Sequence, residues 1–232
     1  MPKSSLSIIR IHNELLGTYG DRGNAHILAF RAGARDIPAE IIDVTYRDPL
    51  PASGDIYLLG GAEDAAQVLS TEALTTSPLR SAIDNGAVVL AICAGFQIIG
   101  ESFFANGQKC QGLGLLDMET IPGTRRYVGD IKVHSPWCES DITGFENHGG
   151  QTILGKDLSP FGSVITGFGN GDGLIDGAVS GNIFGTYLHG PILARNPEFA
   201  DLLLARAVGK VLDPYDDELA NKYAEIRRKA VH

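Results

Sequence analysis

The 232-residue sequence is poor in cysteine and short of positive charge, and each shortage excludes a class of protein. Its three cysteines cannot all pair, which argues against a disulfide-stapled extracellular scaffold and predicts a reducing compartment, the cytoplasm. With 19 basic and 28 acidic residues, the formal net charge is -9. A chain this acidic lacks the basic surface that nucleic acids and anionic membranes attract, so neither is expected as a partner.

Long hydrophobic runs are also missing. The longest uncharged stretch, 85–100, falls short of the roughly 18 apolar residues that a membrane-spanning helix needs, and it contains Gln97. Near the start, the apolar run from Leu6 to Ile9 is interrupted by Arg10, which is not typical of a secretory signal. The sequence therefore predicts no membrane span.

The first half of the sequence alternates strand-like and helix-like segments. The expected strands are SIIRI (7–11), EIIDV (40–44), IYLL (56–59) and AVVLAI (87–92), and the expected helices are 23–34 and 77–85. Apolar strands that alternate with helices are typical of a mostly parallel sheet covered on both faces. From 112 to 190 the many glycines predict a β-rich second half with turns such as GFGNGDG. The fold class is therefore α/β.

The end of the sequence predicts two helices. Asn196 and Pro197 form a cap and first turn, and Gly209 is a suitable stop. The 210–232 segment predicts a helical tail, with its helix over about 216–229. Leu219, Tyr223 and Ile226 lie on one stripe of this helix, which either packs on the chain's own core or contacts a partner. No linker interrupts the chain, so a single domain, 1–232, is expected.

The segment VVLAICAGFQIIG carries the sharpest chemical signal. An apolar strand runs into Cys93, and Ala94 and Gly95 then open a helix, which is the geometry of a nucleophile elbow. A helix N-terminus favours a thiolate, and the Ala94 N–H is placed to donate to an oxyanion. A buried structural cysteine at a strand end is the competing interpretation.

Two further segments supply the remaining parts of a thiol hydrolase. YLLGGAED ends a strand at Gly60 and Gly61, where the backbone can approach a ligand closely. FGTYLHGP places His189 at another strand end, as a candidate base for Cys93. Ligands bind beyond the carboxyl ends of strands in open α/β sheets, so all three segments are expected at one edge. No cysteine or histidine spacing matches a zinc site, and no metal is expected.

The order LGG, CAGFQ, YLHGP resembles the class I glutamine amidotransferases and implies their flavodoxin-like fold. YGDRGN (19–24), GFENHGG (144–150) and YLHGPILARNPEFAD resemble more narrowly the GatD family, the glutaminase subunits of lipid II isoglutaminyl synthase, in the cobyric acid synthase-like branch. The resemblance implies that Cys93 attacks the side-chain amide of L-glutamine and that His189 protonates the departing ammonia.

The resemblance also implies a substrate-binding set. Backbone N–H groups near Gly61 and Ala94 would bind the oxyanion, and Gln97 would hold the substrate or the turn. An arginine of TRRYVGD would bind the carboxylate of glutamine, with Arg126 favoured over Arg125.

One position departs from many family members. Where they carry a glutamate two residues after the histidine, this sequence has Pro191, so a Cys–His dyad is expected. The group that orients His189 is left open. Glu146 is an available carboxylate, and His148 is expected to be structural.

The sequence contains no G-x-x-x-x-G-K-[ST] phosphate loop, so activation of an acceptor needs another polypeptide. The resemblance implies a Mur ligase-like partner, MurT, in a heterodimer. That subunit would bind ATP, Mg2+ and lipid II, and this chain itself would need no cofactor. Ammonia would amidate the D-glutamate of lipid II to D-isoglutamine in peptidoglycan synthesis. The alternatives are the glutaminase of a cobyrinate-type amidotransferase, a cysteine hydrolase or thiol sensor, and a non-catalytic subunit on the same scaffold.

Overall fold

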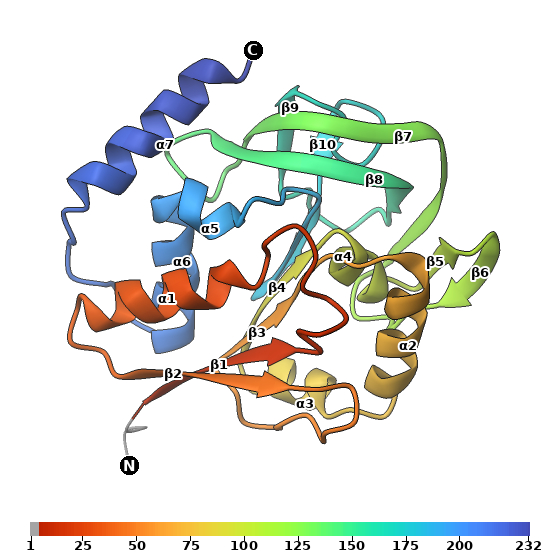
Figure 1. The fold of residues 1–232 in the computed structure, drawn as a ribbon, viewed down its shortest axis with the longest axis horizontal. Helices are drawn as coiled ribbons and strands as arrows, with labels where there is room; N and C mark the ends of the chain where they lie inside the picture. The colour runs from red at the N-terminus through yellow and green to blue at the C-terminus, as the bar shows by residue number, and fades with distance from the viewer. Residues whose placement is uncertain (1–4) are drawn as a thin grey trace.

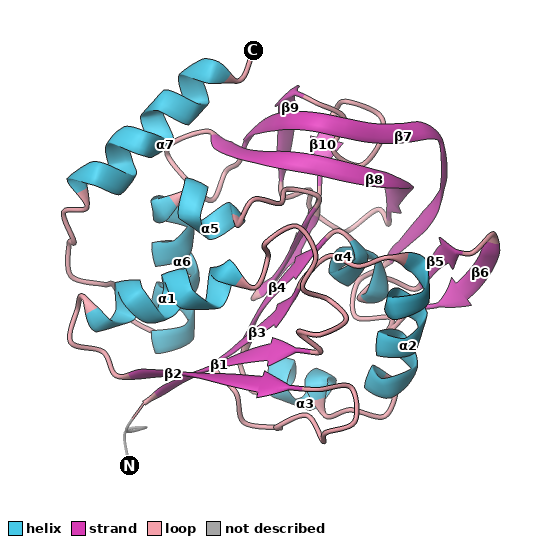
Figure 2. Cartoon of the chain, viewed as in Figure 1, coloured by secondary structure: helices cyan, strands magenta, loops and turns pink. Residues whose placement is uncertain are grey.

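The computed structural model describes residues 5–232, so the first four residues of the predicted domain lie outside the described part. Two six-stranded sheets form the framework (Figures 1 and 2). The first has the order β11-β12-β4-β3-β1-β2. Its strands are β1 (Leu6–Ile11), β2 (Ala39–Val44), β3 (Ile56–Leu59), β4 (Val88–Ile92), β11 (Ala178–Ser180) and β12 (Ile183–Thr186).

This first sheet confirms the predicted α/β class. All its pairings are parallel except that of β11 with β12. Every residue of β3 and β4 is buried, as expected for strands covered on both faces. The helices lie on both sides of the sheet, with α1 and α6 on one side and α2, α3 and α4 on the other (Figure 2).

The second sheet has the order β10-β9-β7-β5-β6, and β8 pairs with β7. It contains β5 (Ser102–Ala105), β6 (Gln108–Gln111), β7 (Met118–His134), β8 (Ile142–Leu154), β9 (Gly162–Thr166) and β10 (Ile175–Asp176). Its strands confirm the β-rich second half, and GFGNGDG forms the turn that links β9 to β10. The long β7–β8 hairpin shifts register between Pro122 and Tyr127, so the residues between them bulge out of the ladder.

Helix boundaries follow the local signals in most cases. The helices are α1 (Gly23–Gly33), α2 (Asp64–Leu74), α3 (Leu79–Asp84), α4 (Ala94–Ile98), α5 (Ile192–Arg195), α6 (Pro197–Val208) and α7 (Glu218–Ala230). α6 starts at the predicted proline and ends before Gly209, which takes the left-handed φ of 71° that glycine tolerates. Helix α2 was not among the expected elements.

The tail helix predicted over about 216–229 is confirmed as α7, and 210–217 leads to it without forming a helix. The buried Arg31 fixes this segment by ion pairs with Asp201 at 2.6 Å and Asp217 at 3.0 Å. Asp217 also caps α7 by accepting the Ala220 N–H. No helix in residues 5–232 is long and apolar enough to cross a membrane.

Candidate active site

Loops that follow four strands of the first sheet meet at its carboxyl edge. Asp21 lies in the loop after β1, Gly61 follows β3, Cys93 follows β4 and His189 follows β12. The parallel pairing of these strands carries all four residues to the same edge. The predicted meeting of the three sequence segments is thus observed, and a fourth segment joins them.

Cys93 occupies a strained turn between β4 and α4. Its φ of 53° and ψ of -107° are unusual for a residue with a side chain, and such strain costs on the order of 1–3 kcal/mol. The turn is tight because a side chain at Gly95 would lie 2.6 Å from the Leu59 carbonyl oxygen. The Cys93 N–H donates to the Thr186 carbonyl at 2.9 Å. The elbow geometry predicted from local sequence is therefore present.

His189 is held by its backbone and by its ring. Its N–H and its carbonyl both bond to Phe145 of β8, at 2.8 and 3.1 Å. Its ring Nδ1 lies 2.8 Å from Asp21 Oδ2. The other nitrogen, Nε2, is buried and has no regular hydrogen bond among the described residues. Because Cys93 also acts on this ring through hydrogen bonding and charge, Nε2 is the nitrogen left to exchange a proton with the thiol.

Asp21 is the functional residue that sequence reasoning missed. Its side chain is 1% exposed and pairs with His189, so a carboxylate orients the imidazole. The expected Cys–His dyad is therefore corrected to an arrangement of three groups. The available signal was the acidic residue between the glycines of YGDRGN, but only long-range folding brings residue 21 to residue 189.

The charge of His189 reflects these contacts. Burial lowers its pKa, but hydrogen bonds to Asp21 and Cys93 and their charges outweigh this effect and raise the pKa to about 10. The site therefore strongly favours the imidazolium that forms when the ring holds a proton. Tyr19 covers it, with ring centroids 4.9 Å apart, and adopts a left-handed φ of 60°.

Gly60 and Gly61 let other segments of the same chain lie close to their backbone. A side chain at Gly60 would lie 2.1 Å from the Leu16 carbonyl oxygen, and one at Gly61 would lie 2.6 Å from His189 Cε1. The Gly61 N–H donates to Asp21 Oδ2 at 2.9 Å. This N–H already has a hydrogen-bond partner. To bind an oxyanion, as predicted, it would have to release Asp21 and donate to the substrate instead. The oxyanion role of Ala94, the first residue of α4, stays a prediction.

Gln97 lies behind the elbow in a buried polar chain. Its amide oxygen accepts from Gln67 Nε2 at 2.9 Å, and its Nε2 donates to the Tyr187 hydroxyl at 3.1 Å. Tyr187 continues the chain to Thr152 at 2.7 Å. The oxygen and the nitrogen of the Gln97 amide thus both have partners within the protein. Of the two roles expected for Gln97, this arrangement suits the one of holding the turn.

The β7 bulge carries both candidate carboxylate-binding arginines. Arg126 Nε donates to Asn147 Oδ1 at 2.7 Å, and the carbonyl of Asn147 lies 4.0 Å from Cys93 Sγ. Arg126 is exposed, and Asn147 lies between it and Cys93. Arg125 instead packs over the Phe168 ring, 4.1 Å from its centroid. Arg126 is thus joined through Asn147 to the Cys93 side of the site, and the choice between the two arginines stays a prediction.

Glu146 and His148 have structural roles at this position. Glu146 is 1% exposed and accepts the N–H groups of Phe168 and Gly169 at 2.9 and 3.0 Å, which anchors the glycine-rich turn. It does not contact His189, because Asp21 takes that place. His148 stacks on Tyr187 with centroids 3.6 Å apart.

Known glutamine amidotransferases resemble this chain over most of its length. The model of the CobB/CobQ-like glutamine amidotransferase domain matches residues 7–197. The chain is 35% identical to the lipid II isoglutaminyl synthase (glutamine-hydrolyzing) subunit GatD of Streptococcus pneumoniae, over 97% of this chain and 93% of that protein. It is 36% identical to the subunit of the same name from Staphylococcus aureus, over 97% and 94%.

More distant relatives are longer or share only the fold. A probable cobyric acid synthase of Methanococcus maripaludis is 33% identical, over 62% of this chain but 31% of that protein. The structure of PurLQS from Thermotoga maritima superposes with a TM-score of 0.60, covering 89% of this chain and 96% of that one. At 17% identity this likeness shows the fold alone.

Proposed function

Because the chain belongs to the family of CobB/CobQ-like glutamine amidotransferase domains, we propose that it hydrolyses L-glutamine with Cys93 as the nucleophile. The observation that carries this proposal is Cys93 on a strained turn beside His189, with Asp21 on the far side of the imidazole. A nucleophile, a base and an orienting group are the parts that acyl transfer requires.

The chemistry follows from the positions of these groups. His189 Nε2 accepts the Sγ proton, and the thiolate attacks the amide carbon of glutamine. The tetrahedral intermediate collapses as the imidazolium gives its proton to the departing nitrogen, which releases ammonia and leaves a glutamyl thioester. His189 then activates a water molecule that cleaves the thioester to glutamate and the free thiol. Asp21 stabilises the imidazolium that forms twice in each cycle.

Arg126 is proposed to bind the α-carboxylate of glutamine, since a guanidinium presents a fork of donors that matches a carboxylate. Its Nε is held by Asn147 beside the nucleophile, which fixes the direction of the fork. Gln97 supports the turn from behind. The Ala94 N–H is proposed as an oxyanion donor.

The Arg126→Ala variant is expected to raise KM for glutamine by roughly 10–100-fold with a smaller change in kcat, because a charge-assisted contact to the substrate is lost. Steady-state ammonia release measures both constants. Arg125→Ala is the matched control, because Arg125 packs on Phe168 and is expected to leave KM within about threefold. If KM rises in Arg125→Ala and stays near the wild-type value in Arg126→Ala, Arg125 is the binding residue.

The acceptor is proposed to be lipid II, amidated at its D-glutamate by a Mur ligase-like subunit of the MurT kind. The support is that this chain matches 93–94% of the length of the two GatD subunits. Their names describe a glutamine-hydrolysing subunit of a lipid II isoglutaminyl synthase. ATP and Mg2+ would bind to that partner. The cobyrinate alternative is less favoured, because the chain spans about a third of those synthases.

The decisive experiment combines the purified chain with the ligase-type subunit, lipid II, ATP and Mg2+, with glutamine as the nitrogen source. Mass spectrometry is expected to show amidated lipid II only when the chain is present. Replacing glutamine with a high concentration of ammonium chloride should support amidation without the chain. If ammonium works and glutamine with the chain does not, the proposed function is wrong. A thiol sensor would show no glutamine turnover and a Cys93 sensitive to peroxide.

A further inference from the structure

The tail helix α7 turns its apolar residues outward. Leu219, Tyr223 and Ile226 are 80%, 49% and 55% exposed. Their spacing of four and three residues places them within about 60° of one another on the helix. This stripe (Leu219, Tyr223 and Ile226) is the one that sequence analysis left open between self-packing and partner contact. A helix in a globular protein normally buries such a stripe.

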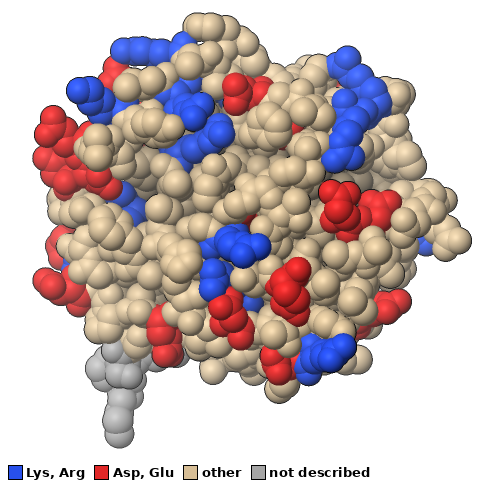
Figure 3. All heavy atoms as spheres, in the orientation of Figure 1, with Lys and Arg blue, Asp and Glu red and all other residues tan. Residues whose placement is uncertain are grey.

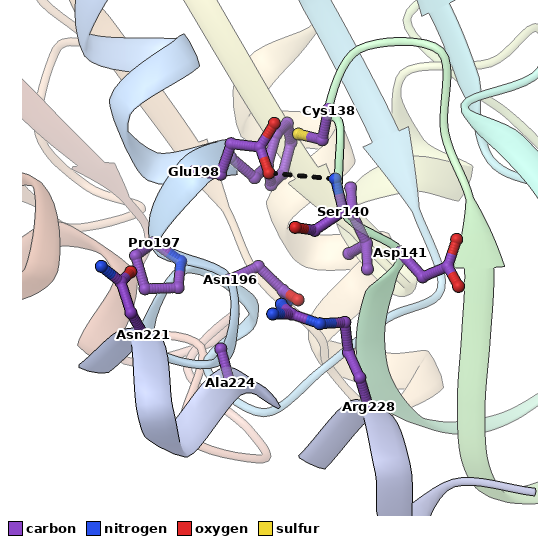
Figure 4. Close-up of a pocket in the computed structure, with 11 residues that line it drawn as sticks. Cys138, Ser140, Asp141, Asn196, Pro197, Glu198, Asn221, Ala224 and Arg228 are labelled. Atoms are coloured by element: carbon purple, nitrogen blue, oxygen red, sulfur yellow. Dashed lines mark hydrogen bonds between the residues drawn. The ribbon is translucent and has the colours of Figure 1, made fainter. Parts of the chain in front are cut away.

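The opposite face of α7 meets the body of the protein with small and polar side chains. Ala224 is the buried residue of the helix. Asn221, Ala224 and Arg228 line a cavity of about 180 Å3 between α7 and the 138–142 loop (Figure 4). The chain's own core therefore does not cover the stripe.

Both ends of α7 are fixed, so the outward stripe is a feature of the folded chain. At the start, Asp217 pairs with the buried Arg31 at 3.0 Å. At the end, Lys132 Nζ donates to the Val231 carbonyl at 2.7 Å. The helix lies along the outer edge of the molecule, and no other element of the described chain covers its outer side (Figure 1).

A row of charges with alternating sign runs beside the stripe. It consists of Glu218, Lys222, Glu225 and Lys229, which fall within about 60° of one another on the helix. Lys229 and Glu225 form an exposed ion pair within the helix at 2.5 Å. Figure 3 shows acidic and basic side chains mixed along this edge.

We propose that α7 pairs with α7 of a second copy of this chain in an antiparallel arrangement. The row of charges reads minus, plus, minus, plus, so reversal of one helix places Glu218 beside Lys229 of the second copy and Lys222 beside Glu225 of the second copy. A parallel arrangement in register places like charges together. The same reversal brings Leu219 of one copy toward Ile226 of the other, with the two Tyr223 rings at the centre. The surface is therefore self-complementary, as a twofold contact requires.

Two other occupants fit the charges less well. Helix α7 carries four basic and two acidic residues, but the row beside the stripe is balanced and the whole chain carries a net charge of -9, so an anionic membrane is the less favoured occupant. A different protein would need its own row of alternating charges to complement this one, whereas a second copy of the chain already carries a complementary row. Two helices of 13 residues form a contact at the small end of specific interfaces, so a weak dimer is expected. The inference is independent of the proposed function, because α7 contributes no residue to the Cys93 site.

Sedimentation equilibrium of the full chain over a wide micromolar range tests the pairing. The wild type is expected to associate reversibly to a dimer. The double variant Leu219→Lys, Ile226→Lys is expected to weaken the dissociation constant by on the order of 100-fold or more, since apolar burial is lost in both copies. Leu174→Lys, at a residue 70% exposed on the β9–β10 side, is the matched control and should dimerise normally. A wild type that stays monomeric, or a double variant that dimerises as well as the control, overturns the proposal.

A charge-exchanged chain tests the direction of pairing. It carries Glu218→Lys, Lys222→Glu, Glu225→Lys and Lys229→Glu, and its row reads plus, minus, plus, minus. It should dimerise with itself, because every cross-helix pair is restored with the signs exchanged. It should not pair with the wild type, because each contact then joins like charges. Native mass spectrometry of a mixture, with one form labelled with nitrogen-15, is expected to show two homodimers, and a statistical share of mixed dimer overturns the antiparallel register.

Discussion

Replacing Cys93 by alanine is expected to lower ammonia release from glutamine by on the order of 10⁴-fold or more, because no other group can form the thioester. The fold should survive, since the variant removes one sulfur atom from a buried turn. Ammonia release and a thermal melt of the same preparation measure the two properties. In the complete amidation reaction, the variant should lose glutamine-driven synthesis and keep ammonium-driven synthesis.

The matched control for this prediction is Cys110→Ala. Cys110 is a partly exposed thiol in β6, where it contacts the Gln108 carbonyl oxygen at 3.7 Å and meets no histidine. This variant should retain full activity. Glutamine turnover that persists in Cys93→Ala would show that the nucleophile lies elsewhere.

Replacing Asp21 by asparagine is expected to lower kcat by roughly 10²–10⁴-fold with a small effect on KM. Asparagine has nearly the shape of aspartate and can still accept the Gly61 N–H, but it supplies no charge to stabilise the imidazolium. The His189 pKa, about 10 in the wild type, should fall, because burial lowers it and one of the two groups that raise it is gone. Iodoacetamide modification of Cys93 at neutral pH should slow, because a less basic imidazole is a weaker partner for the thiolate.

The same variant has a defined effect on stability. A folded-state pKa of about 10 lies above the ordinary value of 6.5, so the protonated His189 stabilises the fold fully below about pH 6.5. This contribution is lost between about pH 6.5 and 10. The Tm difference between wild type and Asp21→Asn should therefore be larger at pH 6 than at pH 9.5.

Asp172→Asn is the control for the Asp21 variant. Asp172 also accepts a backbone N–H, from Leu174 at 2.8 Å, but it lies in an exposed turn without a histidine. Activity and pH profile should match the wild type. Equal kinetics in Asp21→Asn and Asp172→Asn would remove Asp21 from the mechanism and return the site to a Cys–His pair.

The local features of this chain could be predicted because each depends on a few adjacent residues. The apolar run before Cys93 and the small residues after it specify a strand, a tight turn and a helix, and the structure has all three. Pro197 and Gly209 bound α6 for equally local reasons. The meeting of Gly61, Cys93 and His189 also followed from sequence, because parallel strands in an open sheet place their carboxyl ends together.

The partner of His189 could not be predicted in this way. Expectation centred on residues close to the histidine or in the motif GFENHGG, whereas the carboxylate comes from Asp21, 168 positions earlier in the chain. Glu146 was available by composition, but in the fold it binds the backbone of the turn at Phe168 and Gly169. A hydrogen-bond partner depends on distances of about 3 Å, which motif order does not contain.

The tail helix shows the same division. The amphipathic pattern of α7 was visible in the sequence, but the pattern is the same whether the apolar stripe faces inward or outward. Only the anchors at Arg31 and Lys132 determine the rotation that leaves the stripe exposed. By itself the sequence determined the α/β class, the elbow at Cys93 and the sheet edge at which Gly61, Cys93 and His189 meet, because periodicity and turn chemistry are local. The tertiary structure alone decided the role of Asp21, the occupied N–H of Gly61 and the outward face of α7, because each depends on contacts between distant segments.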